Sequence, residues 1–363
     1  MDEEGVRTIT AARLRGFLIN RLHISQGTLL LAMAIAIGLA AGVSALAFES
    51  SYHWLNAHLL VPALTHRHLS FLIIFLPALG GLLVGLLMRA ARQEANGHGV
   101  PEVIESVNLR AGLIRFRKAL VKTLAAVLTI GFGGSAGPEG PMVHVGSAIG
   151  SVGGRLIGSS EEHTKVMISC GAAAGLAAIF HAPITGVIFV LEVILVDFSL
   201  DTFIPIIAAS ITASVFARAA WGSAGALLAG SSYTFQSLWE VPLYVGLGLL
   251  CAVVSVAFIK TFHRVEQLMK GLRIPSILKP ALGGLLVGMV AFKFPHILSD
   301  GYETINTALS GSIPIGLILA LIAAKLLMTS VTLGSGGSGG MFAPTLFLGA
   351  LTGAASGAFV VSR

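Results

Sequence analysis

The nine residues PALGGLLVG occur twice in this sequence, as Pro77–Gly85 and again as Pro280–Gly288, an offset of 203 residues. The same offset aligns a second, distant block, in which the glycine-rich stretch 131–137 meets the glycine-rich stretch 334–340. Further pairs fall in this register: Lys122 with Lys325, Thr129 with Thr332, Pro141 with Pro344, Gly146 with Gly349 and Gly150 with Gly353. One register that holds across two separate blocks indicates an internal duplication.

The charges that flank the duplicated helix indicate how the two copies are oriented. In the first copy basic residues follow it, at Arg89 and Arg92, whereas in the second copy basic residues precede it and Asp300 and Glu303 follow. Basic flanks mark the cytoplasmic side of a membrane segment. We therefore expect the two copies to cross in opposite directions, an inverted-topology repeat of the kind found in transporters.

The composition places the chain in a membrane. It is 55% apolar and only 11% charged, with a mean hydropathy of +0.88, whereas soluble domains are about 25% charged. This excludes a soluble enzyme, a disordered chain and a disulfide-stapled secreted domain. The net charge of +6 comes from basic residues between apolar segments, so it indicates cytoplasmic loops and not a nucleic-acid partner. Cys170 and Cys251 lie inside apolar stretches and predict no disulfide or metal site.

The apolar segments define the expected organisation: an all-α polytopic membrane protein with broken helices. We expect an interfacial helix at 7–23, a spanning helix at 27–48, a histidine-rich loop at 49–68, a second span at 69–88 and a basic cytoplasmic loop at 89–122. The next five segments are short and cut by glycine and proline: 119–130, 141–157, 166–180, 184–198 and 203–217. These five are shorter than the roughly 20 residues of a spanning helix. Later apolar runs lie at 241–262, 280–292, 314–333 and 341–361. Helices broken at membrane depth are tolerated where they line a cavity, which indicates a transport pathway. The expected parts are a cytoplasmic or interfacial segment (1–26), a first membrane repeat (27–225) and a second repeat (226–363).

The two glycine-rich loops predict helix starts that bind an anion. Each leads through a proline into an apolar segment, at Pro141 and Pro344. The first N–H groups of a helix have no partner within the helix, and the helix dipole adds positive potential there. Two such starts brought together by symmetry would bind an anion without a full positive charge.

Glu139 begins one of these helices inside the apolar region, and the second copy has Phe342 at the equivalent position. An ionisable group at this depth indicates function by default. Its carboxylate would compete with the anion for the same N–H groups, closing the path when charged and leaving when protonated. A plain N-terminal cap is the structural alternative.

Other interpretations of the loops stay open at this point. Residues 131–136 match a dinucleotide fingerprint, but no βαβ pattern surrounds them. The stretch 334–340 also has the composition of a flexible linker. A third alternative, from a different class, is a membrane-embedded serine hydrolase or protease that uses Ser135 or Ser338 with a histidine.

At these residues the sequence resembles the CLC family of chloride channels and proton-coupled chloride transporters. Gly137–Pro141 is similar to its GxEGP motif, Gly340–Pro344 to its GxFxP motif and Gly97–Pro101 to its GxGxP motif, and the stretch 172–192 follows the family pattern. The resemblance implies that chloride and similar monovalent anions are the substrates, that Glu139 gates the path, and that the anion-binding residues are His98, Gly137, Pro138, Gly140, Gly340, Met341 and Phe342. It implies no cofactor and no enzymatic activity. It also implies a homodimer in the lipid bilayer, multi-pass with a cytoplasmic N-terminus, in a plasma or inner membrane.

Three departures from the family pattern matter. His98 stands where members often have serine, so whether it contacts the anion stays open. Val193 stands where proton-coupled members usually carry an internal glutamate, which favours a channel-like protein, although an antiporter with a different inner proton route stays open. The chain ends at Arg363, soon after the segment 341–361, where the resemblance implies about four more helices; we therefore expect an incomplete second repeat and a fragment of a longer protein.

Overall fold

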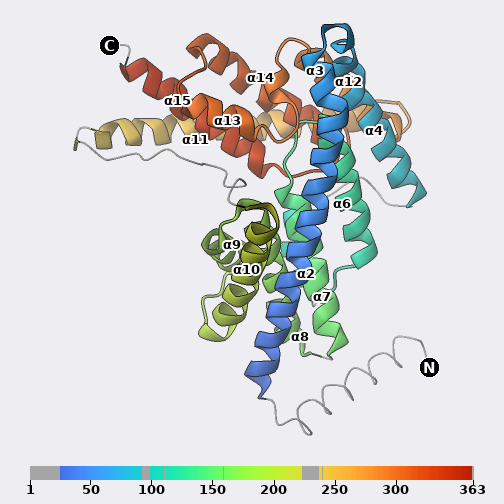
Figure 1. Cartoon of the computed structure of the whole chain (residues 1–363), viewed down its shortest axis with the longest axis vertical. Coiled ribbons are helices and arrows are strands. Elements are labelled where there is room, and N and C mark those ends of the chain that lie inside the picture. The colour runs from blue at the N-terminus through green and yellow to red at the C-terminus, as the bar shows by residue number, and fades with distance from the viewer. Residues whose placement is uncertain are drawn as a thin grey trace. The chain divides into compact units, whose positions relative to one another are not determined.

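The computed structural model describes residues 25–91, 99–109, 112–157, 159–222, 237–238 and 240–361. Within these ranges the regular elements are helices, and the only β-type pairing is one isolated bridge between Gly137 and Gly340 (Figure 1). Seven helical stretches among the described residues are long and apolar enough to cross a membrane: 26–65, 72–90, 161–180, 200–221, 240–271, 315–334 and 342–359. The predicted all-helical, multi-span membrane protein is therefore confirmed. The interfacial helix expected at 7–23 lies outside the described residues.

The described residues form two compact units, and each is considered by itself. Unit 1 comprises 25–49, 99–123 and 139–222. It contains α5 (Gly99–Leu109), α7 (Glu139–Leu156), α8 (Glu161–Phe180), α9 (Pro183–Phe189), the π-helix η3 (Val190–Leu195) and α10 (Leu200–Trp221). Unit 2 comprises 50–91, 124–138, 237–238 and 240–361. It contains η1 (Asn56–Leu60), α3 (Val61–Thr65), η2 (Arg67–Leu69), α4 (Leu72–Ala90), α11 (Glu240–Gly271), α12 (Leu278–Ala291), η5 (Pro295–Ile297), α13 (Tyr302–Leu309), α14 (Ile315–Gly334) and α15 (Phe342–Val361). The chain passes between the units within α2 (Gln26–Leu55) and α6 (Phe116–Gly131).

The histidine-rich loop predicted at 49–68 is wrong for most of its length. The helix that begins at Gln26 continues through the π-helical turn η1 and α3 to Thr65. Leu60 and Ala63 on this extension are buried, whereas His53 and His58 are exposed. The extension thus has one buried side, and its exposed side carries the histidines together with the apolar residues Trp54, Val61 and Leu64.

Two further predictions need correction. The segments expected at 166–180 and 203–217 are longer helices, α8 and α10, of 20 and 22 residues. The polar residues at the start of α8 are helical too, and α10 is extended at both ends. The basic stretch 89–122, predicted as a loop, contains α5, on which Val103, Ser106 and Val107 are buried. The segment at 184–198 does remain short, as predicted, and the run at 280–292 also forms a short apolar helix.

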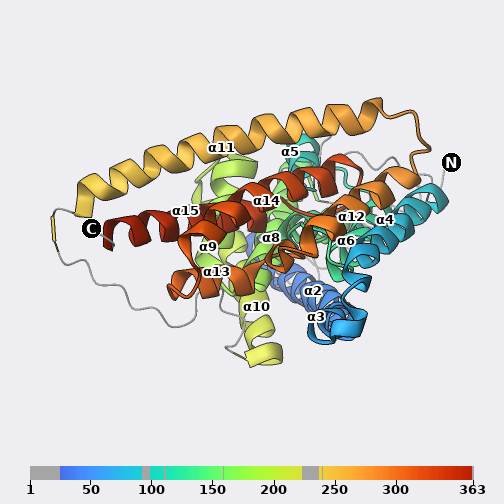
Figure 2. The ribbon, with the colours of Figure 1, turned by 90° about the horizontal axis from the view of Figure 1, so that it is seen from above.

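In unit 2 the duplicated sequence forms a close helix pair, because α4 and α12 carry the two copies of PALGGLLVG (Figure 2). A Cβ atom at any of four glycines would overlap a backbone carbonyl oxygen of the facing helix: Gly81 on Pro280, Gly85 on Ile277, Gly284 on Pro77 and Gly288 on Ile74. As the number rises on one helix it falls on the other, so the helices are antiparallel. The repeat offset also relates the contacts to one another: the counterpart of Gly81 is Gly284, and the counterpart of Pro280 is Pro77. The contact of Gly81 with Pro280 is therefore repeated as the contact of Gly284 with Pro77. The contact is therefore two-fold symmetric.

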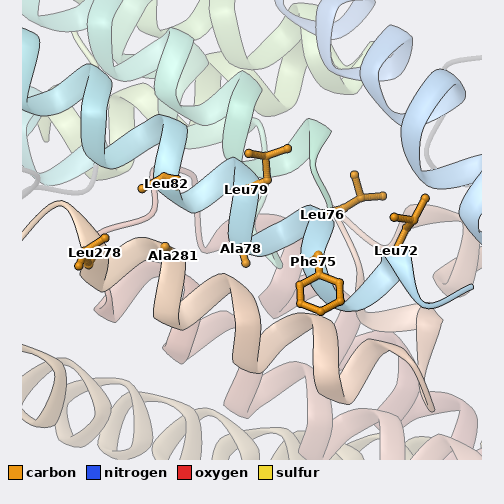
Figure 3. Close-up of a pocket in the computed structure, with 8 residues that line it drawn as sticks. All are labelled: Leu72, Phe75, Leu76, Ala78, Leu79, Leu82, Leu278 and Ala281. Carbon is orange, nitrogen blue, oxygen red and sulfur yellow. The ribbon is translucent and has the colours of Figure 1, made fainter.

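One side of this helix pair exposes an apolar surface. Figure 3 shows an apolar groove of about 460 Å³ between α4 and α12, lined by Leu72, Phe75, Leu76, Ala78, Leu79, Leu82, Leu278 and Ala281. Phe75 is 56% exposed and Leu79 46% exposed. Large exposed apolar side chains on a helix of this hydropathy are expected where a helix faces hydrocarbon.

Candidate anion site

The two glycine-rich loops of unit 2 are joined by hydrogen bonds. The first lies between α6 and α7 and the second between α14 and α15, as predicted. The Gly137 N–H donates to the Gly340 carbonyl at 2.9 Å, and the Gly340 N–H donates to the Gly137 carbonyl at 2.7 Å. The Ser135 N–H donates to Thr332 Oγ1 and the Ser338 N–H donates to Thr129 Oγ1, each at 3.1 Å. In each pair of bonds, the donor position in one loop corresponds to the donor position in the other loop at the repeat offset of 203 residues, and so do the acceptor positions. The two loops are therefore related by the same two-fold symmetry as α4 and α12.

The internal geometry of the loops also matches. The Gly134 N–H donates to the Thr129 carbonyl at 2.7 Å, and its counterpart Gly337 donates to the Thr332 carbonyl at 2.9 Å. Gly133 and its counterpart Gly336 have φ of 92° and 104°, a region that side chains with a Cβ rarely adopt. The glycines that the sequence repeats are thus required by the turn that ends α6 and by the turn that ends α14.

In unit 1 the start of α7 is buried and lies beside the start of α5. Glu139, the first residue of α7, is 1% exposed. A Cβ atom at Gly99, the first residue of α5, would overlap the carbonyl oxygen of Gly140, and it would come within 3.3 Å of His144 Cβ. Two helix starts are therefore in backbone contact, and the dipoles of helix starts favour a negatively charged group nearby.

The predicted site residues of unit 2 fall where the second helix start was expected. Gly340 precedes α15 and is buried, and Met341 and Phe342, at the start of α15, are half-buried. Pro138 is buried directly before α7. The structure brings Gly137 and Gly340 together within unit 2. His98 lies outside the described residues.

A charged cluster that the sequence analysis did not identify lies in unit 1. The Glu102 carboxylate on α5 pairs with Lys118 Nζ at 2.6 Å and with Lys122 Nζ at 2.7 Å, both on α6, and its Oε2 is 3.5 Å from His144 Nε2 on α7. Burial raises the pKa of the Glu102 carboxyl, but the two ammonium groups outweigh this effect and hold the pKa below its usual value. Two features of the sequence could have indicated this cluster: a lysine at the same register position in each copy, and the histidine at position 144 inside the apolar segment 141–157.

The comparisons with known proteins agree with this architecture. The profile of the family described as "Voltage gated chloride channel" matches residues 80–362. The chain is 31% identical over 333 residues to a putative chloride channel protein ClcB-like of Ralstonia nicotianae, covering 89% of this chain and 77% of that one. It is also 31% identical over 360 residues to an H(+)/Cl(-) exchange transporter ClcA of Klebsiella pneumoniae, covering 94% and 75%.

Other relatives are longer, and solved structures share the fold. The chain spans only about half the length of two Arabidopsis thaliana relatives, the chloride channel proteins CLC-f (45%) and CLC-e (50%). Its fold is similar to that of a slow cyanobacterial Cl-/H+ antiporter, with a TM-score of 0.82 at 23% identity over 93% of this chain and 80% of that one. It is also similar to a CLC-type fluoride/proton antiporter, with a TM-score of 0.72 at 25% identity over 90% and 81%.

Proposed function

This chain belongs to the CLC family of voltage-gated chloride channels, and on that premise we propose that it carries chloride and similar monovalent anions across a membrane. The proposed anion donors are the backbone N–H of Gly140 at the start of α7 in unit 1, and those of Met341 and Phe342 at the beginning of α15 in unit 2. Gly137, Pro138 and Gly340 are assigned to the loops that lead to these helices. His98 is assigned to the same path by its place in the motif alone.

The observation that carries the proposal is the symmetric pair of hydrogen-bonded glycine-rich loops. Backbone donors and glycine turns that repeat at an offset of 203 residues end α6 and α14 in the same way. A scaffold of this kind presents helix starts at membrane depth without a lysine or arginine among the donors. Such donors bind an anion weakly enough to release it. The two-fold contacts of α4 and α12 support an inverted-topology repeat.

We assign the gate to Glu139. Its side chain is buried at the start of α7, and the equivalent residue of the second copy is Phe342, which has no charge. Protonation removes the attraction between the carboxylate and the helix start, so external acid opens the path.

Proton coupling is the finer part of the proposal. The relatives named as H(+)/Cl(-) exchange transporters and the antiporter structures favour coupled exchange, whereas Val193 favours a channel-like protein. We propose proton-coupled transport through an inner route that does not use residue 193. A serine hydrolase is not retained, because this family consists of transporters, and Ser135 Oγ is hydrogen-bonded to Thr329 Oγ1 at 3.0 Å in the scaffold.

The test uses the full chain reconstituted in liposomes. We expect chloride to leave chloride-loaded vesicles when a potassium ionophore removes the charge imbalance, nitrate and bromide to substitute for chloride, and protons to enter in exchange. Selectivity among these anions is expected to be loose, because backbone donors form no cage of fixed size. A reversal potential that follows the potassium gradient would contradict the anion assignment.

A further inference from the structure

The cluster of Glu102, Lys118, Lys122 and His144 in unit 1 leads from the surface into the interior. The exposed fraction of the side chain falls from 37% for Lys118 to 18% for Glu102, 6% for Lys122 and 4% for His144. Buried charged groups are expensive and are usually fully paired. The cluster is therefore a continuous line of titratable and charged groups from solvent to a buried imidazole.

His144 has one ring nitrogen within this cluster and one outside it. Nε2 is 3.5 Å from Glu102 Oε2, whereas Nδ1 is buried and has no hydrogen-bond partner. One turn later on α7, the Ser147 hydroxyl is also buried without a partner. A buried polar atom without a partner costs about 1–3 kcal/mol. Both atoms can hydrogen-bond to a water molecule, and such a water molecule can bring a proton to Nδ1.

The place of His144 on α7 connects it to the gate. It lies five residues after Glu139, about 7.5 Å along the helix axis at 1.5 Å per residue, and it is next to Gly99, whose backbone contacts Gly140. The facing part of α8, around Ala172–Ala174, has no charged residue, and Glu161, Glu162 and Lys165 lie at the far end of that helix. Among the described residues, the charged groups that act on His144 are Glu102, Lys122 and Lys118; Glu139 lies on the same helix and Glu105 lies on α5.

We propose that His144, positioned by Glu102, is the inner proton carrier that supplies Glu139, so that this chain exchanges protons for chloride through an imidazole. This inference rests on the proposed function. The neutral ring directs its Nε2–H to Glu102 Oε2, and a proton that water delivers to Nδ1 converts it to imidazolium, which the Glu102 carboxylate stabilises. Transfer of the Nδ1 proton through water to the Glu139 carboxylate restores the neutral imidazole and leaves Glu139 as the neutral acid. The positive charges of Lys118 and Lys122 repel the imidazolium and favour its deprotonation, so His144 releases the proton readily.

The test measures chloride and proton fluxes together in liposomes that contain the full chain. We expect His144→Gln to keep chloride flux near the wild-type rate and to reduce the protons moved per chloride by about 100-fold, the lower range of what a proton-transfer group contributes. The matched control is His58→Gln, an exposed histidine in η1, which should change neither flux. An unchanged proton-to-chloride ratio in His144→Gln would overturn the proposal.

A second variant keeps the test decisive if His144→Gln fails to fold. Lys118 is partly exposed, so Lys118→Met should fold, and removal of its charge favours the protonated imidazole. The pH at which coupled proton flux declines should move upward by about half a unit or more, and an unshifted profile would overturn the proposal. Wild-type chain that carries chloride without protons overturns the carrier role and leaves the anion pathway standing, whereas wild type that carries neither overturns both.

Discussion

The two copies of the repeat bury a lysine at the same position, but different partners stabilise the two ammonium groups. Lys122 in the first copy is 4% exposed and pairs with the Glu102 carboxylate. Lys325 in the second copy is fully buried, donates to the carbonyl oxygens of Ile297 at 3.0 Å and Ser299 at 2.9 Å, and lies 5.1 Å from the centre of the Phe347 ring. The same register thus places one ammonium in an ionisable cluster and the other in a network of carbonyl oxygens and an aromatic face.

The same asymmetry holds at the helix starts. The first copy has Glu139 where the second has Phe342, so only the first copy has an ionisable residue at this helix start. In the second copy the ammonium of Lys325, on α14, hydrogen-bonds to the carbonyl oxygens of residues 297 and 299. The comparison teaches that the duplication preserves the scaffold, whereas the residue at the helix start and the partners of the buried lysine differ between the copies.

The largest expected effect in stability concerns this lysine pair. Lys325→Met leaves two buried carbonyl oxygens without their charged donor, and hydrogen bonds to charged groups are worth about 1.5–3 kcal/mol each. We expect a loss of about 3 kcal/mol or more. Lys122→Met should cost about half as much, because Glu102 keeps Lys118. Thermal unfolding of both variants in detergent measures the difference. Equal losses of unfolding free energy in the two variants would contradict the proposed difference between the environments of the two lysines.

The next effect tests the symmetry of the helix pair. Gly81→Ala and Gly284→Ala each place a methyl group against a carbonyl oxygen of the facing helix. Overpacking of this kind costs about 1–3 kcal/mol, and the two-fold contact predicts the same cost at both positions. Gly246→Ala on α11 is the matched control, since nothing lies within 4 Å of its added methyl group. A large loss at one glycine and none at the other would contradict a symmetric α4–α12 contact.

The smallest effect concerns the loop hydroxyls. Thr129→Val and Thr332→Val each remove the acceptor of one backbone N–H in the opposite loop. A hydrogen bond of this type contributes about 1 kcal/mol, so each variant should lose about that much, and the two losses should agree. Amide hydrogen exchange at Ser338 and Ser135 should rise in the respective variant; protection that stays unchanged in both would show that these bonds do not hold the loops.

Sequence patterns could predict the architecture because the repeat and the hydropathy report directly on segments and turns. The duplicated glycines predicted where α6 and α14 end, and the place of Glu139 predicted a buried acid at a helix start. The helical extension to Thr65 could not be predicted from apolar runs, because its buried side is carried by few residues, such as Leu60 and Ala63. The partner of Lys122 could not be predicted either, since Glu102 is 20 residues away and only the packing of α5 against α7 brings His144 to the same carboxylate.

The central claim is that the Glu139 carboxylate closes the anion path when it is charged. The most direct measurement is chloride flux from liposomes against external pH for the wild type and Glu139→Gln, with protein folding checked by size-exclusion chromatography. We predict that wild-type flux rises as the pH falls, and that the variant conducts at all pH values with a flat profile and no coupled proton movement. A well-folded Glu139→Gln variant that keeps the wild-type pH profile would contradict the claim.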